Sequence, residues 1–202
     1  MSEYFPISPA AQNSHYLGPL PWSPRNKIPA WWDELDENLP IVYVSLGSSG
    51  QVDLLPIVLD ALAPLAVSVI AVTAGRTQLE TTPDNAFVSD YLPGDKAAAR
   101  ASLMICNGGS LSTYQAIQGS TPVLGVVGNL DQHLNMNRIS RAGIGAILRN
   151  EHVTLERLRA LAQQLLTEDH YKESVNRAQR ASQQYTLETQ LPQLIHQALS
   201  SE

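Results

Sequence analysis

The chain has 202 residues and a formal net charge of −6, with 44% hydrophobic and 16% charged residues. This composition can cover the core of an ordinary globular domain, so it excludes a disordered chain. The sequence contains no run of eighteen apolar residues that could span a bilayer. Its acidic balance disfavours nucleic-acid binding, which needs a basic surface. The single cysteine, Cys106, excludes an internal disulfide and fits a reducing, cytoplasmic setting.

The first forty residues differ from the rest of the chain. They hold seven of the 13 prolines and all three tryptophans, Trp22, Trp31 and Trp32, without sustained periodicity. Because exposed aromatic residues favour association, we expect this lead-in (residues 1–40) to lie across a surface. Where that surface is missing, the lead-in could mediate self-association.

Beyond the lead-in, short β-branched runs alternate with helical patterns. The predicted strands cover residues 41–47, 67–75, 86–88, 102–106, 122–127 and 144–148. The predicted helices between them cover residues 52–65, 95–101, 110–118 and 132–141. A leucine stripe after residue 153 predicts a further helix, and a second helical stretch over residues 171–199 is expected to break at Pro192.

The strands are unbroken apolar runs, which is typical of a parallel sheet covered on both faces. The sequence therefore predicts an α/β fold: a doubly wound, Rossmann-like, parallel six-stranded sheet with helices on both faces. Residues 41–165 would form this domain, and helices in residues 166–202 would pack on it. In such folds ligands bind beyond the carboxyl ends of the strands, so the loops that follow the strands are the candidate sites.

The loop and helix start after the fourth predicted strand suit an anion. Gly108 and Gly109 let the backbone approach a ligand closely. Hydroxyl groups follow beside the free amides of a helix N-terminus, on Ser110, Ser112 and Thr113. A diphosphate would fit there. Alternatively, Ser110 is only a helix N-cap and Gly119 ends the helix, a common arrangement that binds nothing.

A second polar cluster follows the fifth predicted strand, at Asn129, Asp131, Gln132 and Asn135. An adjacent acid and amide suit the vicinal hydroxyls of a sugar, because Asp accepts hydrogen bonds and Gln both donates and accepts. The alternative is that Asp131 only caps the helix that follows.

These motifs resemble a known signature. The run NGGSLSTYQAIQGSTPV, followed by DQHLN, is similar to the donor-binding signature of the UDP-glycosyltransferase superfamily, enzymes of the GT-B architecture. LGPLPW, IVYVSLGSSG and FVSDYLPGDKAAARASLMICNGG resemble flanking segments of that family, so the resemblance runs over roughly residues 17–165.

The resemblance implies a role for each matching position, and it implies no metal and no other cofactor. The diphosphate would meet Ser48, Asn107, Gly108, Gly109, Ser110, Ser112 and Thr113. Gln115 would meet the ribose, and Tyr91, Leu92 and Pro93 would receive the uracil ring. Asp131 and Gln132 would hold the donor sugar.

Several positions depart from the family pattern. Asn107 replaces a histidine and cannot carry positive charge, Gln115 replaces a glutamate, and Leu111 replaces a glycine. The resemblance thus leaves room for an altered donor preference or a degenerate site.

The implied function is the donor-binding domain of an inverting glycosyltransferase, with UDP or a UDP-sugar as ligand and TDP as an alternative. A GT-B enzyme has two such domains, and the acceptor pocket and catalytic base belong to the first, so no catalytic residue is expected in this chain. The missing N-terminal acceptor domain or a partner chain would supply them. A non-catalytic module is the alternative, and an NAD-type dehydrogenase is disfavoured because LGSSGQ lacks G-x-G-x-x-G. We expect a cytoplasmic protein and leave peripheral membrane contact open.

Overall fold

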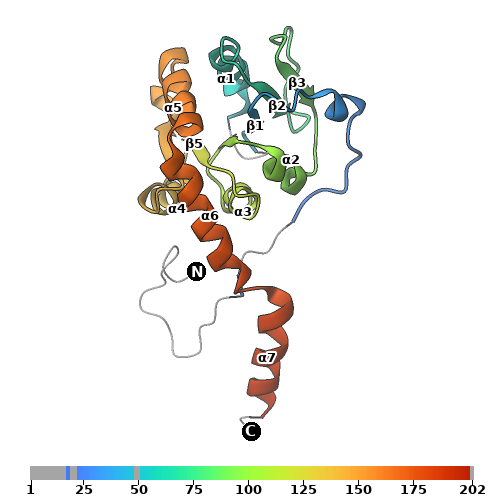
Figure 1. Cartoon of the computed structure of the whole chain (residues 1–202), viewed down its shortest axis with the longest axis vertical. Coiled ribbons are helices and arrows are strands. Elements are labelled where there is room, and N and C mark those ends of the chain that lie inside the picture. The colour runs from blue at the N-terminus through green and yellow to red at the C-terminus, as the bar shows by residue number, and fades with distance from the viewer. Residues whose placement is uncertain (1–16, 19–21, 48–50, 201–202) are drawn as a thin grey trace.

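The computed structural model describes residues 17–18, 22–47 and 51–200 (Figure 1). Its centre is a six-stranded sheet in the order β3-β2-β1-β4-β5-β6, with every neighbouring pair parallel. The strands are β1 Ile41–Ser45, β2 Ser68–Val72, β3 Ala86–Ser89, β4 Leu103–Cys106, β5 Val123–Val127 and β6 Gly145–Arg149. This is the strand order of the doubly wound dinucleotide-binding fold, so the predicted fold class is confirmed.

The strand sequences explain this arrangement. Strands β2, β4 and β5 are buried along their whole length, as expected for apolar runs with helices above and below. Strand β1 lies at the middle of the sheet, where Val44 pairs with Ala71 of β2 on one side and Ile105 of β4 on the other. The chain order reverses between β1 and β4, and this is the position at which open α/β sheets bind ligands.

Helices cover both faces of the sheet. They are α1 Leu55–Leu62, α2 Gly94–Arg100, α3 Ser110–Gln118, α4 Leu130–Arg141, α5 Leu155–Thr167 and α6 Asp169–Gln183. Helix α7 Leu187–Leu199 follows them in the chain. Helices α1 and α5 join one core cluster with Val42 and Val44, while α2, α3, α4 and α6 join the other with Tyr43. Short 3₁₀ turns lie at Ala30–Glu34, Val52–Leu54 and Asn150–His152.

The C-terminal part breaks at a different place from the one expected. Pro192 lies inside α7, and the chain breaks earlier, between Gln183 and Leu187. The carbonyl of Thr186 accepts the N–H of Gln190, which begins the new helix. The predicted break at Pro192 is therefore wrong, since α7 accommodates one missing N–H. Helix α6 packs on the sheet domain, whereas α7 projects away from it (Figure 1).

The described part of the lead-in lies across the edge of the sheet domain. Trp32 is buried, its carbonyl accepts a hydrogen bond from Arg100 Nη1 at 2.5 Å, and the guanidinium lies 5.3 Å from its ring centroid. The Trp31 ring lies 5.5 Å from that of Phe87 in β3. None of the described helices has the length and hydrophobicity that a bilayer crossing requires.

Candidate functional site

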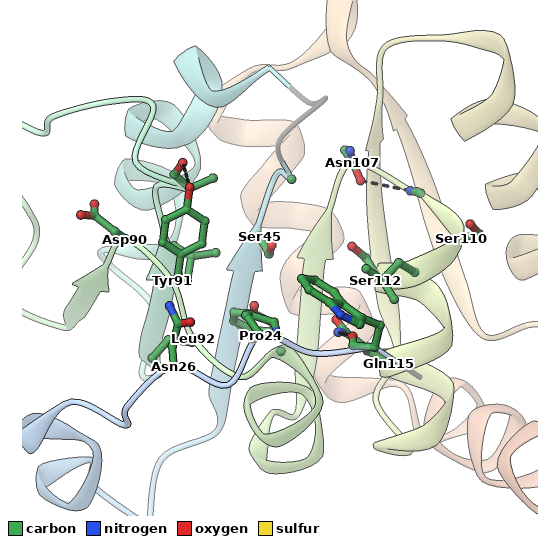
Figure 2. A pocket seen from close by; sticks show the side chains of 18 of the residues that line it. Pro24, Asn26, Ser45, Asp90, Tyr91, Leu92, Asn107, Ser110, Ser112 and Gln115 are labelled. Atoms are coloured by element: carbon green, nitrogen blue, oxygen red, sulfur yellow. Dashed lines mark hydrogen bonds between the residues drawn. The ribbon is translucent and has the colours of Figure 1, made fainter. Parts of the chain in front are cut away.

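A cavity of about 650 Å³ opens at the carboxyl ends of β1 and β4 (Figure 2). It lies at the point where the strand order reverses, as the fold predicts. Its walls come from the strand ends, the start of α3, the loop after β3, α4 and the lead-in. The lining residues are Trp22, Pro24, Asn26, Tyr43, Ser45, Gly47, Val72, Ala74, Asp90, Tyr91, Leu92, Gly94, Asn107, Gly109, Ser110, Leu111, Ser112, Gln115 and Asp131.

The turn after β4 is held in a fixed shape. Asn107 is 5% exposed, and its Oδ1 accepts the N–H of Gly109 at 3.1 Å. Gly108 has a φ of +79°, and a Cβ there would lie 2.5 Å from Cγ of Met136. Only glycine fits this position without strain, because the left-handed region and the close side chain both exclude a larger residue. The turn therefore places Asn107 and Gly109 at the cavity.

Helix α3 starts at this turn with an open N-terminus. Its N-cap is Gly109, which has no side chain to accept the first helical N–H groups. The interpretation of Ser110 as a simple N-cap is therefore wrong, because Ser110 is the first helical residue. Ser110, Leu111 and Ser112 line the cavity, and Figure 2 shows Ser110 and Ser112 on the same side as Asn107. Uncapped amides and the positive end of the helix dipole suit a bound anion.

Two residues expected at the diphosphate lie behind the cavity wall. Thr113 is fully buried, with its Oγ1 3.2 Å from the Gly109 carbonyl and 3.0 Å from the Ser110 carbonyl. Asn135 Nδ2 donates to that hydroxyl at 3.0 Å and to the Gly108 carbonyl at 2.8 Å, which ties α4 to the start of α3. Thr113 and Gly108 thus support the turn from inside. The remaining diphosphate candidate, Ser48, lies outside the described residues.

The loop after β3 forms the opposite end of the cavity. Tyr91 is 50% exposed, and its hydroxyl donates to the Ala74 carbonyl at 2.6 Å. Thr73 donates to Asp90 Oδ1, also at 2.6 Å. Tyr91 and Leu92 line the cavity as a base-binding loop would, whereas Pro93 is the buried N-cap residue of α2 and lies outside the lining.

Gln115 makes a contact that its sequence position did not reveal. It lines the cavity but is only 6% exposed, and its Nε2 donates to the backbone carbonyl of Trp22 at 2.8 Å. Its Oε1 lies close to Gly94, where a Cβ would be 2.7 Å away. Sequence reasoning missed the lead-in residues Trp22, Pro24 and Asn26 as parts of the site; the gathering of tryptophans in the lead-in was the only signal for them.

The two residues expected at the donor sugar take different positions. Asp131 is exposed and lines the cavity. Gln132 is buried: its N–H donates to Asn129 Oδ1 at 2.9 Å, and its Oε1 accepts the N–H of Gly128 at 2.8 Å. Asn129, and not Asp131, is the N-cap of α4. Asp131 is thus left with its carboxylate available at the cavity, while Gln132 closes the start of α4.

Two groups near the floor of the cavity remain neutral at physiological pH. Burial raises the pKa of Tyr43 to about 12, although its hydrogen bond with Ser45 lowers it in part. Burial likewise raises the pKa of Cys106 to about 12, against a smaller opposing effect of its hydrogen bond with the backbone of Gly108. Within the described residues, no group of three or more His, Cys, Asp or Glu side chains could hold a metal ion.

The chain thus has a cavity at the switch point of a doubly wound sheet, beside an open helix N-terminus, which is where domains of this α/β class bind their ligands. Residues 56–196 match the family described as "Erythromycin biosynthesis protein CIII-like, C-terminal domain". The chain belongs to this family of GT-B glycosyltransferase domains, which confirms the resemblance seen in the sequence.

Curated relatives support the same class. The chain is 51% identical over 175 residues to a "PGL/p-HBAD biosynthesis rhamnosyltransferase" of Mycobacterium bovis (strain BCG / Pasteur 1173P2), covering 87% of this chain and 39% of the relative. It is 48% identical over 179 residues to a "PGL/p-HBAD biosynthesis glycosyltransferase" of Mycobacterium tuberculosis (strain ATCC 25177 / H37Ra), covering 89% and 42%. The chain thus spans less than half the length of these relatives.

A solved structure shows the shared fold. The spinosyn rhamnosyltransferase SpnG complexed with thymidine diphosphate matches with a TM-score of 0.78 at 19% identity. The match covers 91% of this chain and 51% of that chain.

Proposed function

We propose that this chain is the donor-binding half of an inverting glycosyltransferase and holds a nucleoside diphosphate sugar in the cavity between β1 and β4. The open N-terminus of α3 carries the proposal, since Gly109 leaves its first amides uncapped at the cavity beside Asn107. The names of the curated relatives, a rhamnosyltransferase and a glycosyltransferase, support the same reaction class.

The cavity walls suggest how the donor lies. The diphosphate would meet Asn107, Gly109, Ser110 and Ser112. Ser48 is a further candidate, because it follows the lining residue Gly47 in the sequence. The base would lie at the loop of Tyr91 and Leu92, and the ribose near Gln115. The sugar would reach Asp131. UDP and dTDP are both candidates for the nucleotide. We include dTDP because the structurally similar SpnG was solved in complex with thymidine diphosphate.

The proposed chemistry is a displacement at the anomeric carbon. The acceptor oxygen attacks that carbon, the bond from it to the diphosphate oxygen breaks, and the nucleoside diphosphate leaves with the electron pair. In this chain, backbone amides at the start of α3 and the Asn107 side chain would stabilise the charge that grows on the leaving group. The base that removes the acceptor proton would come from an acceptor domain or a partner chain. The proposal includes a cytoplasmic setting and invokes no metal ion.

Calorimetric titration tests this function. The chain is expected to bind UDP or dTDP and the corresponding nucleotide sugar. Asp131→Ala should weaken binding of the nucleotide sugar by about tenfold, as for the loss of hydrogen bonds to a charged group, and binding of the free nucleotide by less than about twofold. Asp169→Ala is the matched control, because Asp169 is also an exposed first-turn acid, on α6 and away from the cavity lining.

Two results would contradict the proposal. Equal losses for nucleotide and nucleotide sugar in Asp131→Ala would remove the assigned sugar contact. Absence of binding to every nucleotide at millimolar concentration would favour the alternative, a non-catalytic module.

A further inference from the structure

One wall of the cavity comes from the lead-in, far from the other walls in sequence. Residues 22–26, which we call the strap, contribute Trp22, Pro24 and Asn26 to the lining. Figure 2 shows Pro24 lying between Gln115 and Leu92, and Asn26 lying beside Leu92, so the strap passes from the proposed ribose position to the loop after β3. Any nucleoside bound there would lie beside the strap.

Hydrogen bonds fix the backbone of the strap to the sheet domain. The buried Gln115 donates from Nε2 to the Trp22 carbonyl at 2.8 Å. The N–H of Asp95, in the first turn of α2, donates to Ser23 Oγ at 3.4 Å. The strap is thus attached to α3 at Trp22 and to α2 at Ser23.

The backbone of Trp22 is hydrogen-bonded to the domain, whereas its side chain is exposed to solvent. It is 63% exposed although it lines the cavity, so its indole ring is held at the site without being buried by the protein. Because Trp22 is exposed and also lines the cavity, its ring has a free face on which a ligand in the cavity can pack. Aromatic rings provide a broad apolar face on which a nucleobase can stack, and removing such a ring costs about five- to a hundredfold in affinity.

The residue type at position 115 fits this arrangement. An amide nitrogen can donate to the Trp22 carbonyl, whereas a carboxylate would place two acceptor oxygens against it. The departure from the glutamate of the family pattern therefore has a structural consequence in this chain, because Gln115 can hold the strap and a glutamate cannot.

Resting on the proposed function, we propose that Trp22 is a ligand-contacting residue whose indole packs on the nucleoside of the donor, and that Gln115 is a positioning residue acting through Trp22. Gln115 fixes the Trp22 backbone, and the fixed backbone keeps the ring over the base and ribose.

A double-mutant cycle on nucleotide affinity tests the inference. Trp22→Ala should weaken binding of UDP or dTDP by about tenfold, and Trp22→Phe by about threefold, because a smaller aromatic face remains. Gln115→Met removes the donor that holds the Trp22 carbonyl without adding a charge to the cavity. It should cost about tenfold in the wild-type background but less than about twofold when Trp22→Ala is already present, since the ring that Gln115 positions is gone. Trp31→Ala is the control, because that ring packs on Phe87 and lies outside the cavity lining.

Inorganic diphosphate is the second probe. It lacks the nucleoside, so all five variants, including the double variant, should bind it as the wild type does. Loss of diphosphate binding along with nucleotide binding would show general damage to the site and overturn the inference. Additive losses in the cycle would also overturn it, because Gln115 would then contact the ligand itself. If the wild-type chain binds no nucleotide, the proposed function fails. If it binds and Trp22→Ala binds equally well, only this inference fails.

Discussion

The starts of α3 and α4 follow neighbouring strands at the same edge of the sheet, yet they are built in opposite ways. Helix α4 closes its own N-terminus: Asn129 Oδ1 accepts the N–H of Gln132, and Gln132 Oε1 accepts that of Gly128. This resembles a capping box, in which the first and fourth residues satisfy each other's amides. Helix α3 has glycine at the N-cap and opens on a cavity of about 650 Å³.

The difference is between a helix start capped by a side chain and one without a side-chain cap. Free N–H groups at a helix terminus need partners, which can come from the chain or from a ligand. In α4 the chain provides them. In α3, Asn107 of the preceding turn instead accepts the N–H of Gly109, and the amides that follow have no side-chain cap; our proposal assigns these amides to the diphosphate.

The largest effect should come from Gly108, which shapes the turn before α3. Gly108→Ala would force a Cβ into a backbone with φ of +79° and to 2.5 Å from Met136 Cγ. We expect the free energy of unfolding to fall by about 3 kcal/mol, from left-handed strain and overpacking. Urea unfolding measures this loss.

Gly128→Ala, at the corresponding turn before α4, is the control. A Cβ there would meet Asn150 Nδ2 at 3.4 Å, an ordinary contact, and we expect a loss below about 1 kcal/mol. Equal losses in the two variants would show that the turn before α3 has no special geometry.

Adding an N-cap side chain to α3 should lower nucleotide affinity and raise the free energy of unfolding. Gly109 has the extended backbone of an N-cap residue, with φ −67° and ψ 153°. Gly109→Asp would place a carboxylate on the amides that we assign to the diphosphate. We expect nucleotide affinity to fall roughly thirtyfold by charge repulsion, and stability to rise by about 0.5 kcal/mol through the helix dipole. Calorimetry and urea unfolding measure the two changes.

Asn129→Asp adds the same charge at the N-cap of α4, where a cap already exists. Nucleotide affinity should change less than about twofold, because the charge is separated from the cavity and screened by solvent and salt. A similar loss of affinity in both variants would mean that the α3 amides do not bind the ligand.

The smallest effect concerns alkaline pH. The turn before α3 rests on Cys106, whose Sγ lies 3.3 Å from the N–H of Gly108. Burial raises the pKa of Cys106 from 9.0 to about 12, so the unfolded chain loses this proton at lower pH than the folded one. The contribution to stability is complete below pH 9 and is lost as the pH rises toward about 12.

At pH 9.5 this loss should be somewhat under about 1 kcal/mol relative to pH 7.5. Cys106→Ala removes the titrating group, so its stability should fall less over the same range in urea titrations. Tyr43 remains in both proteins, and burial raises its pKa from 10.0 to about 12, which adds an equal alkaline loss to each. Identical pH dependence of the two proteins would contradict the assignment to Cys106.

Much of the fold was predictable because it depends on local patterns. Helix α3 has the predicted bounds, Ser110–Gln118, and the six strands lie within one residue or a few of their predicted ranges. Helix α4 starts at Leu130 and not at residue 132, because Asn129 provides the cap. The break expected at Pro192 is absent, since the loss of one backbone N–H donor does not interrupt α7.

The site was predictable only in part. The glycines and hydroxyl groups after β4 are neighbours in the sequence. The sheet places their turn at the cavity, so most of them lie together there as well. The partners of Thr113 and Gln132 were not visible, because a polar side chain near a helix start can face either a ligand or the protein. For Thr113, the packing of α3 against α4 decides between these two, because Asn135 of α4 donates to the Thr113 hydroxyl.

By itself, the sequence determined the alternating strands and helices, the parallel sheet and the glycine turn before α3, because hydrophobic periodicity and glycine placement act over a few residues. The tertiary structure decided that Trp22 and Gln115, 93 residues apart, meet at one wall of the cavity. A contact over that separation depends on how the whole domain closes around its core, and no local pattern records it.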